Sequence, residues 1–177
     1  RYIDRCGYTS SFTIYDTSDS ERLMKEILRD QGLDDKTYPP RYVLSVIGRQ
    51  KDRLISPEEM EEDSRSASDY RIVQIARVYG IYQKRLKDNN ALDFDDILYV
   101  TVKLLQQDQE VREYYQRKFH YVLVDEYQDT NHVQYLLTEL LAGSRRNICV
   151  VGDDDQSIYR FRGATIENIL SFEEQYP

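Results

Sequence analysis

Long apolar runs and paired cysteines are both missing from this sequence. The longest apolar stretches, such as residues 121–124 and 148–151, are far shorter than the roughly 20 residues that cross a bilayer, so we expect no membrane span. The two cysteines, Cys6 and Cys149, lie far apart, and neither has a second ligand at zinc-type spacing. We expect neither a disulfide nor a zinc site, and we expect a buried thiol at Cys149 because it lies inside an apolar run.

Two sequence signals are absent as well. The chain starts without the basic and apolar segments of a secretory signal, so we expect a piece of a longer intracellular protein. A phosphate-binding loop of the form G-x-x-x-x-G-K-[ST] needs a glycine followed by a lysine, and none of the 7 glycines precedes one. The chain therefore lacks the loop with which many nucleotide hydrolases hold the phosphates.

Positive charge is scarce in the second half of the chain. Lys and Arg balance Asp and Glu at 16 each over residues 1–88, so the whole net charge of −8 falls in residues 89–177. Because nucleic-acid binding depends largely on neutralising phosphates, any such contact must be local. The densest basic cluster, Arg49, Lys51 and Arg53, is either a solvated helix face or a nucleic-acid contact.

The first half of the sequence has the patterns of helices joined by polar turns. A capping-box pattern at Ser18 to Glu21 predicts a helix start, and Gly32 predicts its end. Further helices are predicted after Pro39, after Ser56, over residues 68–88 and after Asp93. Apolar residues at helical spacing predict the inward faces of the last two: Ile72, Ile75, Val78, Tyr79 and Tyr82 in one, and Ile97, Val100 and Leu104 in the other.

From Tyr121 onward the pattern changes to strands. Residues 121–125 and 147–153 are apolar strands, and the amphipathic segment between them, 130–144, predicts a helix that ends at Gly143. This order predicts a parallel β-α-β unit whose strands are buried on both faces. Because one such unit does not make a stable sheet, its further strands must come from sequence absent here, from unrecognised segments of this chain, or from another chain. A final helix is predicted over residues 165–176.

Carboxylates follow both predicted strands. Asp125 and Glu126 end the first, and the run Gly152-Asp-Asp-Asp-Gln156 ends the second, so both clusters are expected at one edge of the sheet. Hard oxygen ligands favour Mg²⁺, which usually comes with phosphates, as in the Walker B arrangement. The alternative is that the acidic residues only cap the following helix, through Asp129 or Thr130.

The full strings around these carboxylates resemble the UvrD/PcrA/Rep family of superfamily 1 DNA helicases. DEYQDTN at 125–131 is similar to the family's motif II, VVGDDDQSIYRFRGA at 150–164 to its motif III, and ALDFDDIL at 91–98 to the segment before motif II. The resemblance implies an α/β fold: a helical subdomain of the 1B type over residues 1–88, and part of a RecA-like P-loop NTPase domain, with a parallel sheet, over residues 89–177.

The resemblance also implies roles for single residues and for partners. Asp125 holds Mg²⁺, Glu126 is the general base, and Gln156 senses the γ-phosphate of ATP. Tyr159, Phe161 and Arg162 contact single-stranded DNA, with Phe161 where the family often has Trp. The implied protein is an ATP-dependent 3′–5′ DNA helicase or translocase of the bacterial cytoplasm, which acts at single-strand/duplex junctions with accessory repair or replication proteins.

Three interpretations of the activity stay open at this point. The first is that motor, with the isolated chain inactive because it lacks the phosphate-binding loop. The second is the motor part of a helicase-nuclease of the AddA or RecB kind. The third is a DNA-binding or protein-binding module that does not hydrolyse ATP.

Overall fold

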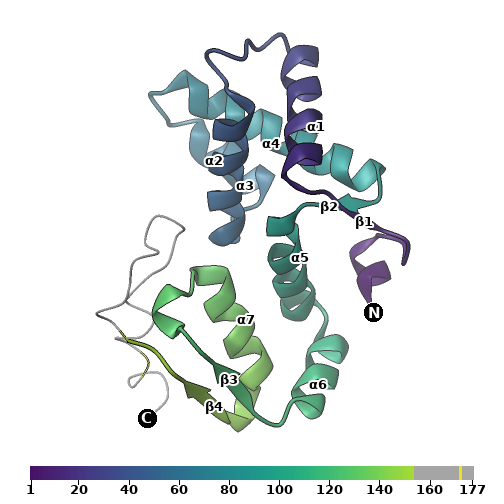
Figure 1. Ribbon diagram of the computed structural model, residues 1–177, viewed down its shortest axis with the longest axis vertical. Coiled ribbons are helices and arrows are strands. Elements are labelled where there is room, and N and C mark those ends of the chain that lie inside the picture. Colours follow the sequence, from purple (N-terminus) through teal and green to yellow (C-terminus); the bar gives the residue numbers. More distant parts are fainter. Residues whose placement is uncertain (154–171, 173–177) are drawn as a thin grey trace. The chain divides into compact units, whose positions relative to one another are not determined.

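The computed structural model describes residues 1–153 and Phe172, and its contacts divide the chain into two units, Arg1–Ile97 and Leu98–Pro177 (Figure 1). The first unit is mainly helical. Its elements are η1 (Ile3–Cys6), β1 (Thr13–Ile14), α1 (Thr17–Asp30), α2 (Pro40–Asp52), α3 (Pro57–Ser64), α4 (Tyr70–Asp88), β2 (Ala91–Leu92) and the start of α5 (Phe94–Gln107). The elements that follow α5 are α6 (Gln109–Lys118), β3 (Val122–Val124), η2 (Tyr127–Asp129), α7 (His132–Ala142), η3 (Gly143–Arg145) and β4 (Ile148–Val150).

Side-chain caps set the helix starts in the first unit. Ser56 and Glu59 form a reciprocal capping box at α3, as the sequence predicts. The box predicted at Ser18 to Glu21 is wrong, because Asp16 caps α1 instead and its carboxylate accepts the Asp19 N–H at 2.8 Å. Several consecutive residues here are good caps, so composition alone does not select one of them.

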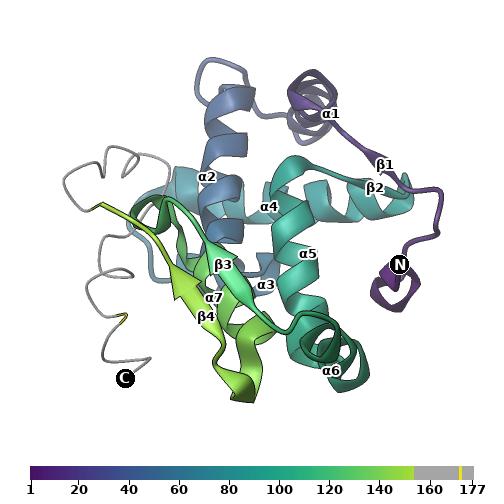
Figure 2. The same cartoon turned by 60° about the horizontal axis from the view of Figure 1, so that its bottom comes forward.

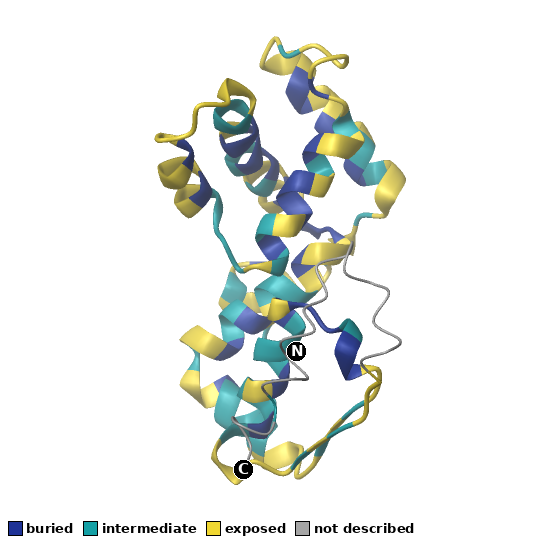
Figure 3. Ribbon diagram, turned by 90° about the vertical axis from the view of Figure 1, so that its left-hand side faces the viewer, coloured by how far each residue is buried: buried dark blue, intermediate teal, exposed yellow. Residues whose placement is uncertain are grey.

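The core of the first unit joins one face of α1 to one face of α4. Figure 3 shows the buried residues on the inward sides of these helices. The predicted stripe on α4 is confirmed for Ile75, Val78, Tyr79 and Tyr82, which are at most 1% exposed, whereas Ile72 is only partly buried at its edge. At the end of α1, Gly32 adopts φ +68, and the Leu33 N–H bonds back to the Leu28 carbonyl, which confirms the predicted stop.

A short parallel pairing closes the first unit. Thr13 pairs with Ala91 and Ile14 with Leu92, so the segment just after α4 belongs to the same compact unit as the N-terminus. Along the chain, the boundary between the two units lies between residues 97 and 98. The division into family subdomains at residues 88 and 89 stays a prediction.

The inward face predicted for α5 is wrong at Ile97, whose exposed fraction is 38%. The buried apolar side chains of this helix are Val102 and Leu105, and Val100 and Leu104 are half-buried. Apolar residues lie on nearly every side of α5, so their spacing does not select a single face.

The second unit contains the predicted parallel β-α-β arrangement. β3 and β4 pair in register Val122 with Ile148, Leu123 with Cys149 and Val124 with Val150. α7 packs against one face of this pair (Figure 2). The α/β class and the parallel pairing are confirmed.

Burial on both faces of these strands, however, is wrong. Leu123 is 76% exposed and Val151 is 59% exposed, and Cys149, predicted to be a buried thiol, is exposed. Side chains alternate along a strand, so the neighbours of Leu123 and Cys149 face α7 while these two face away from it. An apolar run shows that a strand suits burial, but not which of its faces a neighbouring segment covers.

Within the described residues, neither Cys6 nor Cys149 forms a disulfide, and none of the helices has the length and apolar content of a membrane span.

Candidate functional site

The two predicted carboxylate clusters begin at the same edge of the β3–β4 sheet. Asp125 and Glu126 directly follow β3, and Asp153 lies three residues after β4. Two main-chain hydrogen bonds join the strand ends: Val151 N–H to the Val124 carbonyl at 2.8 Å, and Tyr127 N–H to the Val151 carbonyl at 2.9 Å. The other predicted site residues, namely Gln156, Tyr159, Phe161 and Arg162, lie outside the described residues.

The backbone turns sharply at Glu126. This residue adopts φ +53 and ψ +41, the left-handed region that side chains other than glycine rarely occupy. Its N–H donates to Asp125 Oδ1 at 2.9 Å, which fixes the turn from one side. Strained backbone of this kind is concentrated at functional sites, and here it presents both carboxylates to solvent.

Gln128 is a site residue that the sequence analysis did not identify. It is 1% exposed, its Nε2 donates to Glu126 Oε2 at 2.8 Å, and its Oε1 accepts the Asp153 N–H at 2.9 Å. One buried amide thus connects the end of β3 with the chain that follows β4. Hydrophobic periodicity carries no signal for such a bridge; the only hint is an amide two residues after the carboxylate pair.

The segment after Gln128 anchors the turn to α7. Asn131 forms a capping box with Gln134, so the alternative that Asp129 or Thr130 caps this helix is wrong. Thr130 instead donates its hydroxyl to the Tyr127 carbonyl at 2.7 Å. Tyr127 is fully buried, and its ring meets Phe172 edge-on at 5.7 Å. The turn that carries the carboxylates is therefore tied to a buried tyrosine and to the start of α7.

The carboxylates at this edge are hard oxygen donors of the kind that Mg²⁺ takes. Asp125 keeps Oδ2 available, and Glu126 makes no ion pair within the described residues. In that part of the chain, no group of three or more His, Cys, Asp or Glu side chains could cage a metal ion. Mg²⁺ typically takes one or two carboxylates and completes its shell with water and phosphate oxygens.

The predicted basic cluster does not form one continuous exposed surface, because its central residue is buried. Lys51 is 1% exposed, and its ammonium lies 2.7 Å from Asp93 Oδ2 and 2.9 Å from Asp96 Oδ1. Burial raises the pKa of the Asp96 carboxyl, and the Lys51 charge opposes that shift. The prediction of a solvated or DNA-contacting Lys51 is therefore wrong, although Arg49 and Arg53 are exposed.

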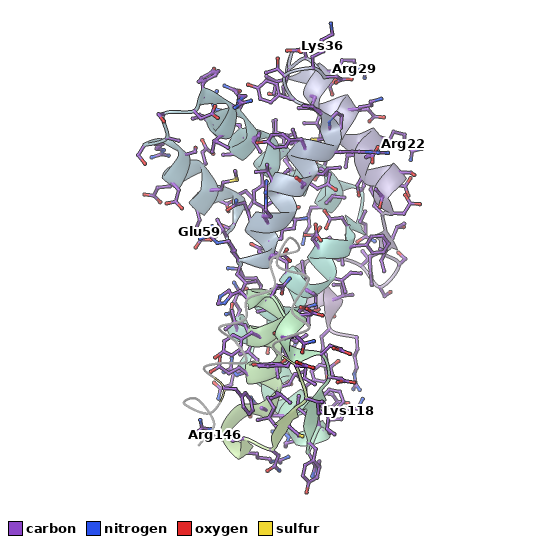
Figure 4. All side chains as sticks on the ribbon, turned by 60° about the vertical axis from the view of Figure 1, so that its left-hand side comes forward. Arg22, Arg29, Lys36, Glu59, Lys118 and Arg146 are labelled. Carbon is purple, nitrogen blue, oxygen red and sulfur yellow. The ribbon has the colours of Figure 1, made fainter. Side chains whose placement is uncertain are left out.

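Further exposed positive charge lies on another helix of the first unit. On α1, Arg22 and Arg29 project outward (Figure 4), with exposed side-chain fractions of 72% and 79%.

A carboxylate pair at the carboxyl end of a parallel strand, with an α-helix leading to the next strand, fits part of an α/β domain of the RecA-like class. More narrowly, the chain belongs to the UvrD/REP helicase N-terminal domain family, whose model matches residues 1–177. This confirms the resemblance seen in motifs II and III.

Named relatives agree with this membership. The chain is 50% identical over its full length to the ATP-dependent DNA helicase PcrA of Bacillus subtilis (strain 168). It is 47% identical to the protein of the same name from Staphylococcus aureus (strain Mu50) and to that from Staphylococcus epidermidis (strain RP62A). The chain spans 24% of the length of each of these relatives.

Proposed function

We propose that this chain is part of an ATP-dependent DNA helicase that couples ATP hydrolysis to 3′–5′ movement on single-stranded DNA, in DNA repair or replication in the cytoplasm. The observation that carries the proposal is the outward-facing Asp125 and Glu126 pair at the end of β3, in a chain 50% identical to a PcrA helicase. Single-strand/duplex junctions and accessory repair or replication proteins are the partners that this function implies.

Two carboxylates divide the chemistry at the strand end. Asp125 would hold Mg²⁺, which neutralises phosphate charge when bound. Glu126, the next residue along the chain and turned outward by its left-handed backbone, accepts the proton of the water that attacks the γ-phosphate. Asp125 also holds the Glu126 N–H, so the metal ligand and the base are fixed relative to each other.

The remaining roles rest on the family motif. Gln156 senses the γ-phosphate, and Tyr159, Phe161 and Arg162 form the track for single-stranded DNA. Two aromatic residues and an arginine combine base stacking with phosphate contact, and such a local track can operate in a chain whose second half is acidic.

The test is DNA-dependent ATP hydrolysis by the full-length protein. Glu126→Gln should lower kcat by about 10²- to 10⁴-fold, because it removes the general base and little else. Glu139→Gln makes the same chemical change at an exposed position of α7 and should leave kcat unchanged. A kcat for ATP hydrolysis that stays unchanged in Glu126→Gln would refute the proposal.

We also propose that the isolated chain hydrolyses no ATP, because no glycine in it precedes a lysine and the phosphate-binding loop is absent. An ATPase rate of the isolated chain that disappears in Glu126→Gln would refute this second statement.

A further inference from the structure

We infer that Gln128 is a positioning residue, which orients the Glu126 carboxylate and makes that orientation depend on the chain after β4. The inference rests on the proposed function, in which Glu126 is the general base. Its structural part is the bridge itself: Glu126 Oε2 at 2.8 Å on one side and the Asp153 N–H at 2.9 Å on the other.

The chemistry of the two partners fixes how the amide points. A carboxylate accepts hydrogen bonds and a main-chain N–H donates one, so the NH₂ group must face Glu126 and the carbonyl must face Asp153. The reversed amide would lose both bonds. Gln128 is thus locked at both ends, and it cannot rotate without leaving a buried polar group unpaired.

A packing role alone does not explain a glutamine at this position. The side chain is 1% exposed, and an apolar residue of similar volume would fill the space without the cost of burying an amide. Both polar ends of Gln128 are used on the two strand ends. The Glu126 carboxylate, in contrast, is exposed and has no ion pair in the described part of the chain, so Gln128 is what restrains it.

The bridge has a mechanistic consequence. Asp153 begins the acidic run within motif III, so a shift of its main chain would move the Gln128 carbonyl and, with it, the amide donor that holds Glu126. The base is then correctly placed only while the start of that run is in position. A displacement of about 1 Å at a catalytic group is enough to change a rate substantially.

Two substitutions in the full-length protein separate the two ends of the bridge. Gln128→Leu removes both hydrogen bonds, and kcat should fall roughly 10- to 100-fold with KM for ATP unchanged. Gln128→Glu keeps an oxygen for the Asp153 N–H but loses the donor to Glu126, so kcat should also fall. Gln107→Leu, the same change at an exposed position of α5, is the matched control and should have no effect.

A double mutant distinguishes positioning from general damage. If Gln128 acts through Glu126, adding Gln128→Leu to Glu126→Gln should cause little further loss, because the group being positioned is already gone. Losses that multiply, or an unchanged kcat in Gln128→Leu, would overturn the inference.

Amide hydrogen exchange of the same proteins supplies a readout that does not need activity. Exchange at Asp153 should speed up about 3- to 10-fold in Gln128→Leu, since its acceptor is lost, but not in Gln128→Glu. Exchange at Val151, which bonds to the Val124 carbonyl, should stay the same in both. If Glu126→Gln leaves the rate of ATP hydrolysis unchanged, the proposed function is wrong. The exchange rate at Asp153 still tests the Gln128 bridge separately, and an unchanged rate in Gln128→Leu would show that the bridge is not formed.

Discussion

The two units of this chain differ in whether their clustered charged residues are buried and paired or exposed. In the first unit, Lys51, Asp93 and Asp96 are buried together, and the ammonium lies within 2.9 Å of both carboxylates. In the second, Asp125 and Glu126 are exposed at a strand end and form no ion pair within the described residues. The first cluster satisfies itself and is structural, whereas the second leaves negative charge available for a cation from outside.

The same contrast applies to apolar side chains. Leu28 and its neighbours are sealed between helices in the first unit, while Leu123 and Val151 of the sheet are largely exposed. Buried apolar side chains in the described chain are therefore concentrated in the helical unit, and the exposed carboxylates proposed to act on ATP lie at the edge of the sheet.

The largest expected effect comes from breaking the buried ion cluster. Lys51→Met leaves two buried carboxylates without their cation, and we expect a loss of about 3–5 kcal/mol in the free energy of unfolding, measured by urea titration. Combining it with Asp93→Asn and Asp96→Asn should recover most of that loss, because the amides need no counter-charge and still cap α5. A Lys51→Met protein as stable as the parent would show that the Lys51 ammonium does not stabilise the two buried carboxylates, contrary to what the distances indicate.

A second pair of substitutions tests the contrast in burial. Leu28→Ala should cost about 2–5 kcal/mol of unfolding free energy, since Leu28 is fully buried. Leu123→Ala, the same change at a residue that is 76% exposed, should change it by less than about 0.5 kcal/mol. Equal losses would mean that something covers the outer face of β3 in solution.

The strained turn at Glu126 predicts a smaller difference in unfolding free energy, in which glycine is more stabilising than alanine. Glu126→Gly should be more stable than Glu126→Ala by about 1 kcal/mol, because glycine adopts φ +53 without the clash that a Cβ causes. At Glu139, inside α7, the order should reverse, with Ala more stable by about 1 kcal/mol. Thermal unfolding of the four variants measures both differences, and the same order at both positions would contradict the strained backbone at Glu126.

Much of the fold could be predicted from the sequence, since helices and strands depend on local patterns. The stripe on α4, the stop at Gly32 and the parallel pairing of the two apolar strands all follow from periodicity and turn chemistry. Family membership also followed, because the motif strings are distinctive.

Three of the errors and omissions share one physical cause. Lys51 finds its carboxylate partners more than forty positions along the chain, and Gln128 reaches Asp153 across a strand pair. Cys149 is exposed although it lies in an apolar run. Each outcome depends on which side chains the tertiary fold brings together, and local spacing contains no record of that. The strand pattern itself places Asp125 and Glu126 at a sheet edge, so their position was predictable. The contact between Gln128 and Glu126 depends on tertiary structure and was not.

The last comparison concerns alkaline pH and again contrasts a residue of the first unit with one of the second. Burial, together with the nearby Asp96 carboxylate, raises the pKa of Tyr8 in the first unit from 10.0 to about 12. Because the folded-state pKa lies above the unfolded one, this tyrosine contributes stability below pH 10 that is lost as the pH rises toward 12. Tyr8→Phe should therefore make the decline of unfolding free energy over that range shallower, whereas Tyr121→Phe, at a residue that is 73% exposed in the second unit, should leave it unchanged. Urea titrations at a series of pH values measure the slope, and a Tyr8→Phe slope equal to that of the parent would show that Tyr8 does not carry the alkaline sensitivity.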